Sequence, residues 1–244
     1  MILYPRADTS PPPEGAEDVA IDVGGAAIGA RFYTFDAAFP TILYFHGNGE
    51  VASDHDDISR FYEQARVNLF VAEFRGYGRS TGTPTFAALV GDAHPVVERF
   101  HALLDERGFA EPRFVMGRSL GSHPALEIAA NGSARMRGLI IESGAANLRR
   151  LLGFLGAGTA QGDAEALAEA HEAKIRSITI PTLIIHGARD ELIPLNHAVE
   201  LHDMLDGIER ELVVIPNAGH NDILWLGYRE YFAALGAFVA RNAG

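Results

Sequence analysis

A single serine stands between two glycines in the stretch GRSLG, where an apolar run ends and a helix-like segment begins. Gly117 and Gly121 permit a sharp turn with close backbone approach, and Ser119 stands at the apex of that turn. Such a pattern also arises by chance, and Ser119 could simply cap the N-terminus of the following helix. A serine hydroxyl becomes a good nucleophile only when a positioned base removes its proton. If Ser119 does chemistry, the chain must therefore supply a histidine and an acid beside it.

The segments around this turn alternate between two kinds of pattern. Short apolar runs, most of them ending near glycine or proline, are typical of strands buried on both faces of a parallel sheet. These runs begin at Thr41, Asn68, Arg113, Gly138, Pro181 and Glu211. Segments with apolar residues at helical spacing cover residues 53–66, 86–107, 119–131, 195–206 and 228–241. Repeated strand and helix predict an α/β fold with a doubly wound, mostly parallel sheet.

Two further segments complete the expected architecture. Apolar runs on either side of Gly24 and Gly25 predict an antiparallel hairpin at one edge of the sheet. Residues 145–177 are longer than a simple crossover connection needs, and they predict a small cap made of two short helices. No internal repeat and no Gly/Ser-rich linker divides the chain, so residues 1–244 are expected to form one domain that includes this cap.

The composition restricts the classes of function. The 244 residues carry a formal net charge of -12, whereas nucleic-acid binding needs a basic face, so no nucleic-acid partner is expected. The chain has no cysteine, which excludes disulfides and a cysteine nucleophile and fits a cytoplasmic location. No apolar stretch has the length of a signal-peptide core or a membrane span, although a peripheral membrane contact stays open. Neither a metal-ligand motif nor a GxGxxG fingerprint after the first strand occurs, so no metal or cofactor is expected.

The stretch around Ser119 resembles the nucleophile elbow of the α/β-hydrolase fold, in which the triad follows the chain order serine, acid, histidine. The stretches LYFHGNGE, EFRGYGRSTGTPT and AGHND resemble other loops of that family. From about Tyr33 onward, the chain is most similar to small hydrolases of the Bem46-like and ABHD13- or ABHD17-like subgroup. Glu73 and Ser122 depart mildly from that pattern, since aspartate and glycine are common there, but neither residue belongs to the triad.

The resemblance implies the partners of Ser119. Asp190 in HGARDELIP and His220 in NAGHND each follow a buried strand, so both should lie at the same edge of the sheet as Ser119. Asp190 would orient His220, and His220 would take the Ser119 proton. The chain has ten histidines, and His220 is preferred because it alone follows the last strand. For the acid, Glu142 after the preceding strand stays a minor alternative, either in the triad or as an anchor of the cap or of the RGYGRS loop.

The family pattern also implies the groups that stabilise a developing oxyanion. One donor should be the backbone N–H of Leu120, which follows the nucleophile at the start of a helix. The other should be the backbone N–H of Asn48, because Gly47 and Gly49 let that loop approach closely. The apolar residues Leu151, Leu152, Phe154 and Leu155 would either line an acyl pocket or form the core face of a cap helix.

The resulting interpretation is a serine hydrolase that cleaves an ester or thioester of a small-molecule acyl substrate through an acyl-enzyme intermediate. A serine peptidase of prolyl-oligopeptidase type uses the same triad and is the first alternative. A non-catalytic binding protein with a hydrolase fold is the second, although such proteins usually lose a triad member. The acyl group and the oligomeric state stay open, because fold does not give substrate.

Overall fold

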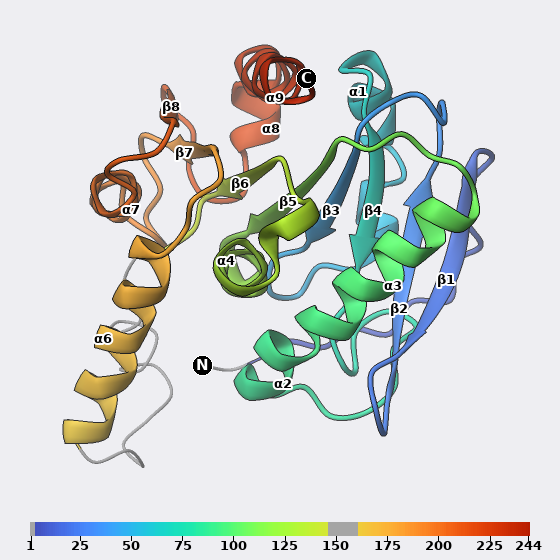
Figure 1. The fold of residues 1–244 in the computed structure, drawn as a ribbon, viewed down its shortest axis with the longest axis horizontal. Helices are drawn as coiled ribbons and strands as arrows, with labels where there is room; N and C mark the ends of the chain where they lie inside the picture. The colour runs from blue at the N-terminus through green and yellow to red at the C-terminus, as the bar shows by residue number, and fades with distance from the viewer. Residues whose placement is uncertain (1–2, 146–160) are drawn as a thin grey trace.

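The computed structural model describes residues 3–145 and 161–244, and in this part of the chain one eight-stranded sheet forms the centre. The strands run in the order β1-β2-β4-β3-β5-β6-β7-β8 across the sheet (Figure 1). Their bounds are β1 (Ala16–Asp22), β2 (Ala27–Tyr33), β3 (Thr41–Phe45), β4 (Asn68–Ala72), β5 (Arg113–Arg118), β6 (Gly138–Glu142), β7 (Thr182–Gly187) and β8 (Arg210–Ile215). All six predicted apolar runs are strands of this sheet, which confirms the predicted fold class.

Strand direction also follows the prediction. β1 pairs antiparallel with β2 and lies at the sheet edge, and β2 pairs antiparallel with β4. From β4 to β8 every pairing is parallel. Gly24 and Gly25 both have positive φ in the turn between β1 and β2, which explains why glycine is needed there. The parallel part therefore places the carboxyl ends of β3 to β8 at one edge.

Helices cover both faces of the sheet. The helix bounds are α1 (Ser59–Gln64), α2 (Phe86–Gly91), α3 (Ala93–Glu106), α4 (Ser122–Asn131), α6 (Gln161–Arg176), α7 (Asn196–Met204), α8 (Ile223–Leu226) and α9 (Tyr228–Asn242). Short 3-10 turns are η1 (Ala52–His55), η2 (Ser119–Gly121) and η3 (Ser133–Arg135). In Figure 1, α2, α3, α4, α6 and α7 lie on one side of the sheet, and α1, α8 and α9 lie on the other. The alternation of strand and helix thus produces a doubly wound sheet.

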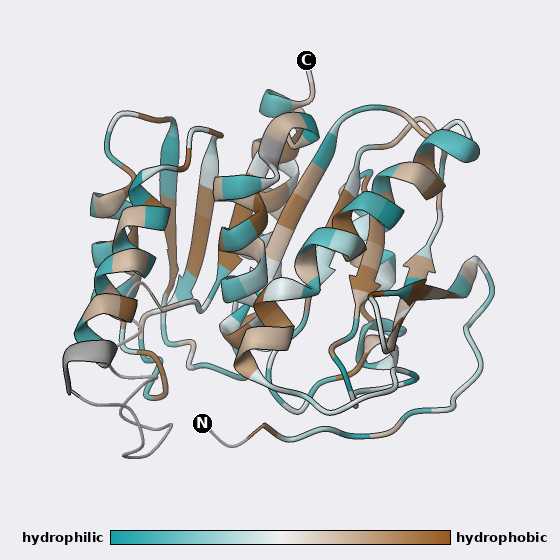
Figure 2. Cartoon of the chain, turned by 60° about the horizontal axis from the view of Figure 1, so that its bottom comes forward, coloured by the Kyte–Doolittle hydropathy of each residue, from teal (hydrophilic) through white to brown (hydrophobic). Residues whose placement is uncertain are grey.

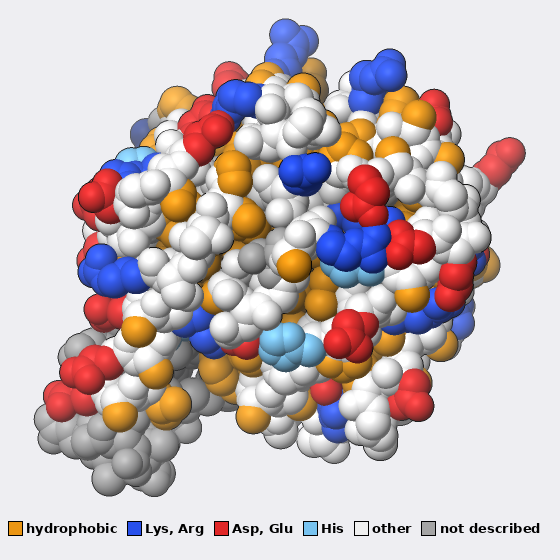
Figure 3. Space-filling view, viewed as in Figure 1, with side chains coloured by type: hydrophobic (Ala, Val, Ile, Leu, Met, Phe, Trp, Pro, Cys, Tyr) orange, Lys and Arg blue, Asp and Glu red, His pale blue; other side chains and the backbone are white. Residues whose placement is uncertain are grey.

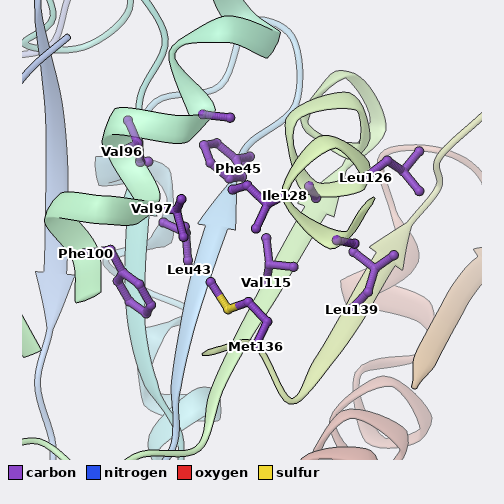
Figure 4. Close-up of a cluster of buried hydrophobic side chains, with 14 of the residues drawn as sticks. Leu43, Phe45, Val96, Val97, Phe100, Val115, Leu126, Ile128, Met136 and Leu139 are labelled. Atoms are coloured by element: carbon purple, nitrogen blue, oxygen red, sulfur yellow. The ribbon is translucent and has the colours of Figure 1, made fainter. Parts of the chain in front are cut away.

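Two hydrophobic clusters hold these layers together, one on each face of the sheet. On one face Leu43 and Val115 pack against Leu126 of α4 and Phe100 of α3 (Figure 4). The middle strands are buried on both faces and are mostly apolar, as their brown colour in Figure 2 shows. This burial is the reason that continuous apolar runs, rather than alternating ones, mark the strands in the sequence.

Some predicted helices are interrupted. Residues 86–107 form α2 and α3 with a break at Asp92, because the ring nitrogen of Pro95 cannot donate a helical hydrogen bond to Gly91. Residues 53–66 form η1 and α1 instead of one helix. The rest of the predicted helices agree with the structure within a few residues at their ends.

The segment predicted to form a cap is partly described. Residues 146–160, with the apolar group Leu151, Leu152, Phe154 and Leu155, lie outside the described residues. Of the two predicted short helices, the second is α6, a helix of 16 residues that packs against α4 and α7, and the first lies outside the described residues. A separate cap within one domain stays a prediction.

Two features of the described residues concern contact with membranes and with polyanions, namely the character of the helices and the distribution of surface charge. In residues 3–145 and 161–244, no helix combines the length and apolar character that crossing a bilayer requires. Figure 3 shows Lys and Arg interspersed with Asp and Glu on the face that it presents.

Candidate active site

The turn that carries Ser119 is a strained elbow between β5 and α4. Ser119 has φ 51°, in the left-handed region that is costly for a residue with a side chain. A Cβ on Gly117 would lie 2.1 Å from the carbonyl oxygen of Gly121, and a Cβ on Gly121 would lie 2.1 Å from the carbonyl oxygen of Phe45. Glycine is therefore required at both positions. The elbow is held by backbone packing on both sides, which lifts Ser119 to the carboxyl edge of the sheet.

The structure brings Ser119, His220 and Asp190 together in one chain of hydrogen bonds. The Ser119 Oγ lies 2.9 Å from His220 Nε2, and His220 Nδ1 lies 2.8 Å from Asp190 Oδ2. His220 and Asp190 are only 8% and 5% exposed, so water does not compete strongly for these bonds. With a carboxylate as acceptor, Nδ1 carries the proton and Nε2 is left to accept from the serine hydroxyl.

Asp190 is held by more than the histidine. Its Oδ1 accepts hydrogen bonds from the backbone N–H groups of Leu192 at 3.0 Å and Ile193 at 2.7 Å. Burial alone would raise the pKa of Asp190, but the hydrogen bonds from His220 and the Ile193 N–H bring that pKa below its usual value. The carboxylate is thus charged at neutral pH, and its orientation is fixed by the loop after β7.

The competing acid has a different partner. Glu142 accepts from Arg118 Nε at 3.0 Å and from the Tyr231 hydroxyl at 2.7 Å. Neither partner belongs to the RGYGRS loop, so these contacts do not support Glu142 as an anchor of that loop, and its expected role as an anchor of the cap stays a prediction. Among the described residues, His220 Nδ1 donates its hydrogen bond to Asp190 and not to Glu142.

The two loops expected to stabilise an oxyanion lie beside the elbow. Leu120 is in the first turn of the helical segment, where N–H groups have no partner within the helix. A Cβ on Gly121 would also lie 2.7 Å from the carbonyl oxygen of His46, so the loop 46–49 passes against the elbow. The Gly47 N–H already donates to Glu50 Oε2 at 2.7 Å, which argues against Gly47 as the second donor. The Asn48 side chain accepts from the Tyr77 hydroxyl at 2.7 Å, which fixes this residue in the loop.

Sequence reasoning missed three residues close to this site. Arg118, Glu50 and Asn221 join the elbow, the loop after β3 and the loop after β8. They also line a cavity of about 210 Å³ whose other wall is formed by residues before α1 and in α8. The position of Arg118 inside the GRSLG stretch could have indicated that it lies near the site. Nothing in the sequence indicates which acceptors its guanidinium would contact.

A serine hydroxyl, a buried imidazole and an oriented carboxylate at these distances can move a proton from the hydroxyl to the imidazole. The same edge of the sheet carries backbone N–H groups at the start of a helix, where negative charge is stabilised. The geometry therefore suits nucleophilic attack by Ser119 on an electrophilic carbon.

Comparisons with known proteins agree with this fold. The family described as serine aminopeptidase, S33, matches residues 37–161. Protein bem46 of Schizosaccharomyces pombe is 29% identical over 210 residues, which are 83% of this chain and 68% of that protein. The human alpha/beta hydrolase domain-containing protein 17B is 32% identical over 212 residues, 83% of this chain and 67% of that protein. The chain spans about two thirds of the length of the curated relatives it matches.

A solved structure gives the same result for the whole chain. The Pyrococcus furiosus esterase Pf2001 superposes on this chain with a TM-score of 0.78 at 18% identity. The superposition covers 100% of this chain and 100% of the esterase chain. At that identity the likeness shows the shared fold. Together with the match over residues 37–161, these relatives show that the chain is a hydrolase of the α/β-hydrolase family described as serine aminopeptidase, S33, in the subgroup that contains Bem46 and the ABHD17 proteins.

Proposed function

We propose that this protein is a serine hydrolase that cleaves an ester or a thioester through an acyl-enzyme intermediate. The observation that carries the proposal is the hydrogen-bonded chain from Ser119 Oγ through His220 to Asp190, with distances of 2.9 and 2.8 Å. Ser119 is the nucleophile, His220 the general base and Asp190 the residue that orients the imidazole.

In the first half of the reaction, Ser119 Oγ attacks the carbonyl carbon of the substrate while its proton passes to His220 Nε2. The carbonyl oxygen becomes an oxyanion, which the backbone N–H groups of Leu120 and Asn48 stabilise. When the tetrahedral intermediate collapses, the bond from carbon to the alcohol oxygen or thiol sulfur breaks. His220 Nε2 returns its proton to that leaving group, and the acyl group stays on Ser119.

In the second half, water replaces the leaving group. His220 Nε2 takes a proton from the water, and the water oxygen attacks the acyl carbon. The second tetrahedral intermediate expels Ser119 Oγ, which regains its proton from His220. The products are a carboxylic acid and the free enzyme.

The charges near the site favour an ester or thioester over a peptide. A peptidase that acts from the amino terminus needs a carboxylate available for the substrate ammonium group. Glu50 and Glu142 in the neighbouring cavity both pair with Arg118, and Asp54 pairs with Arg6. Each of these carboxylates is therefore already paired with an arginine, and Glu50 and Glu142 share Arg118. The esterase Pf2001 is a structural relative with the same broad activity.

The test is covalent labelling followed by a substrate screen. A fluorophosphonate probe should label the wild-type protein, and the mass shift should map to the peptide that contains Ser119. Ser119→Ala should abolish labelling, whereas Ser122→Ala, which removes a hydroxyl in the same peptide, should keep it. Equal labelling of Ser119→Ala would contradict the proposed nucleophile, and a wild type that is never labelled would favour a non-catalytic binding protein.

A screen then separates the activities that share this triad. p-Nitrophenyl esters and acyl thioesters of several chain lengths should be turned over faster than aminoacyl p-nitroanilides. The reverse order would favour the peptidase alternative. The small-molecule acyl substrate, the cytoplasmic location and the absence of a cofactor stay predictions.

A further inference from the structure

Arg118 is an almost buried cation placed between the parts of the proposed site. It ends β5 directly before Ser119 and lies opposite Glu142 in the register of β5 and β6. Its side chain is only 11% exposed. A guanidinium buried to this extent needs partners for all of its N–H groups, and the directions in which it donates therefore define a rigid arrangement.

Two branches of the guanidinium are anchored by carboxylates. Nε donates to Glu142 Oε1 at 3.0 Å, and Nη1 donates to Glu50 Oε1. Burial alone would raise the pKa of Glu50, but the charge of Arg118 lowers that pKa below its usual value. The pair of Glu50 and Arg118 is therefore charged at neutral pH.

The third branch reaches the loop that carries the proposed base. Nη2 donates to the carbonyl oxygen of His220 at 2.8 Å and to Asn221 Oδ1 at 3.0 Å. Asp190 therefore orients the imidazole of His220, while Arg118 holds the backbone of His220. These are independent constraints on where His220 Nε2 lies relative to Ser119.

Glu50 extends the network to the loop expected to stabilise the oxyanion. Its Oε1 binds Arg118, and its Oε2 accepts from the Gly47 N–H at 2.7 Å. A Cβ on Gly47 would lie 2.5 Å from Arg118 Nη1, so the loop lies directly against the guanidinium. One cation therefore connects the elbow, the loop after β3 and the loop after β8.

We infer that Arg118, anchored by Glu142 and Glu50, is a positioning residue that holds the His220 loop and the Gly47 loop in register with Ser119. This inference rests on the proposed triad. The hydrogen bonds of Arg118 go to Glu142, Glu50, Asn221 and the His220 carbonyl oxygen, and among the described residues none goes to the side chain of Ser119 or His220, so Arg118 acts through the distance from Ser119 Oγ to His220 Nε2. A displacement of about 1 Å in such a geometry can cost about 100-fold in rate.

Arg118→Lys is the first test, because it keeps the charge but loses the planar fork that serves three directions at once. We expect kcat for p-nitrophenyl butyrate to fall about 100-fold, with KM within about threefold of wild type. The second-order rate of fluorophosphonate labelling should fall in parallel, since it reports the reactivity of Ser119 without turnover.

Arg113→Lys is the matched control. Arg113 begins the same strand, is fully buried and pairs with Asp105, but it lies at the opposite end of β5 from Ser119. We expect Arg113→Lys to lower the melting temperature at least as much as Arg118→Lys while kcat stays within about threefold of wild type. If both variants lose kcat equally at a temperature where both are folded, Arg118 contributes only stability and the inference is wrong.

Chemical rescue gives a second readout that a purely structural role would not produce. The cavity of about 210 Å³ beside Arg118 provides room for a small planar cation. In Arg118→Ala, millimolar guanidinium should recover at least tenfold of the lost kcat, and ammonium at the same ionic strength should not. Equal effects of the two cations contradict the inference.

Asn221→Ala covers the case in which Arg118→Ala does not fold. It removes one acceptor of Nη2 from an exposed side chain, and we expect a loss of a few-fold in kcat. The outcomes separate this inference from the proposed function. If Ser119→Ala stays active, the proposed triad fails. If Ser119→Ala is inactive but folded Arg118→Lys keeps wild-type kcat, only the positioning role of Arg118 fails.

Discussion

Replacing Asp190 by asparagine tests the proposed acid, because the structure fixes which way the new amide must point. Asp190 Oδ1 accepts from the N–H groups of Leu192 and Ile193, and only an oxygen can take that place. The asparagine NH₂ group would therefore face His220 Nδ1. That nitrogen must then accept a hydrogen bond, which moves the imidazole proton to Nε2. In this tautomer Nε2 cannot take the proton of Ser119.

The magnitude follows from the cost of the alternative orientation. Turning the amide so that its oxygen faces His220 would place the NH₂ group against the partly buried N–H donors of Leu192 and Ile193. Each donor left unsatisfied costs about 1–3 kcal/mol, so restoring the useful tautomer costs about 2–6 kcal/mol. At about 1.36 kcal/mol per factor of ten, kcat should fall between about 30-fold and 10⁴-fold. The same replacement in a well-studied triad protease costs about 10⁴-fold.

The assay measures kcat for the best p-nitrophenyl ester together with the melting temperature. Asp190→Asn should stay folded, because its oxygen still accepts from both loop N–H groups. Asp222→Asn is the matched control, since this carboxylate accepts from the Gly219 N–H in the same loop as His220 and an amide oxygen can replace it. Folded Asp190→Asn with kcat within threefold of wild type would refute the reasoning. If Glu142→Gln abolishes turnover instead, the acid has been assigned to the wrong residue.

Two further predictions concern stability. Gly121→Ala should destabilise the fold by at least about 3 kcal/mol in urea unfolding, because its Cβ would lie 2.1 Å from the backbone oxygen of Phe45. By contrast, a Cβ on Gly236 in α9 meets only an ordinary contact at 3.7 Å. Gly236→Ala should therefore raise the free energy of unfolding by at most about 1 kcal/mol. Burial lowers the pKa of His123 to about 3 and that of His171 to about 4, so the unfolded chain binds protons first as the pH falls below about 6.5. The free energy of unfolding should therefore decrease as the pH is lowered from about 6.5 to 4. Each histidine should contribute a loss of about 2 kcal/mol at pH 5. Melting curves recorded at several pH values should show a weaker pH dependence for His171→Leu.

Much of the fold was predictable because its signals are local. Each middle strand is buried on both faces, and an apolar run between glycines or prolines marks it directly. The same locality placed Ser119, Asp190 and His220, since a residue just past a parallel strand must lie at one edge of the sheet. Pro95 indicates the interruption at Asp92, because proline cannot donate a helical hydrogen bond. A prediction from the spacing of apolar residues alone misses this interruption.

The network of Arg118 was not predictable for the opposite reason. Its contacts join residues that are 68 and 102 positions apart in the sequence, and each depends on how a side chain leaves the end of a strand or a loop. Any of several nearby carboxylates could pair with an arginine inside the elbow, and residue types do not distinguish them. Only the register of β5 against β6 places Glu142 opposite Arg118.

The position of each residue relative to the end of its strand explains why two acids at the same edge have different partners. Arg118 and Glu142 are the last residues of β5 and β6, so their side chains still lie within the layers of the sheet and pair with each other. Ser119 and Asp190 come after the ends of β5 and β7, and His220 comes after the end of β8, so loops carry all three above the edge. A carboxylate inside the layer can reach the arginine beneath the proposed site, whereas one beyond the strand can reach the imidazole. Extending β7 by pairing across residues 188–190 would therefore withdraw Asp190 from His220, even though its chemistry would be unchanged.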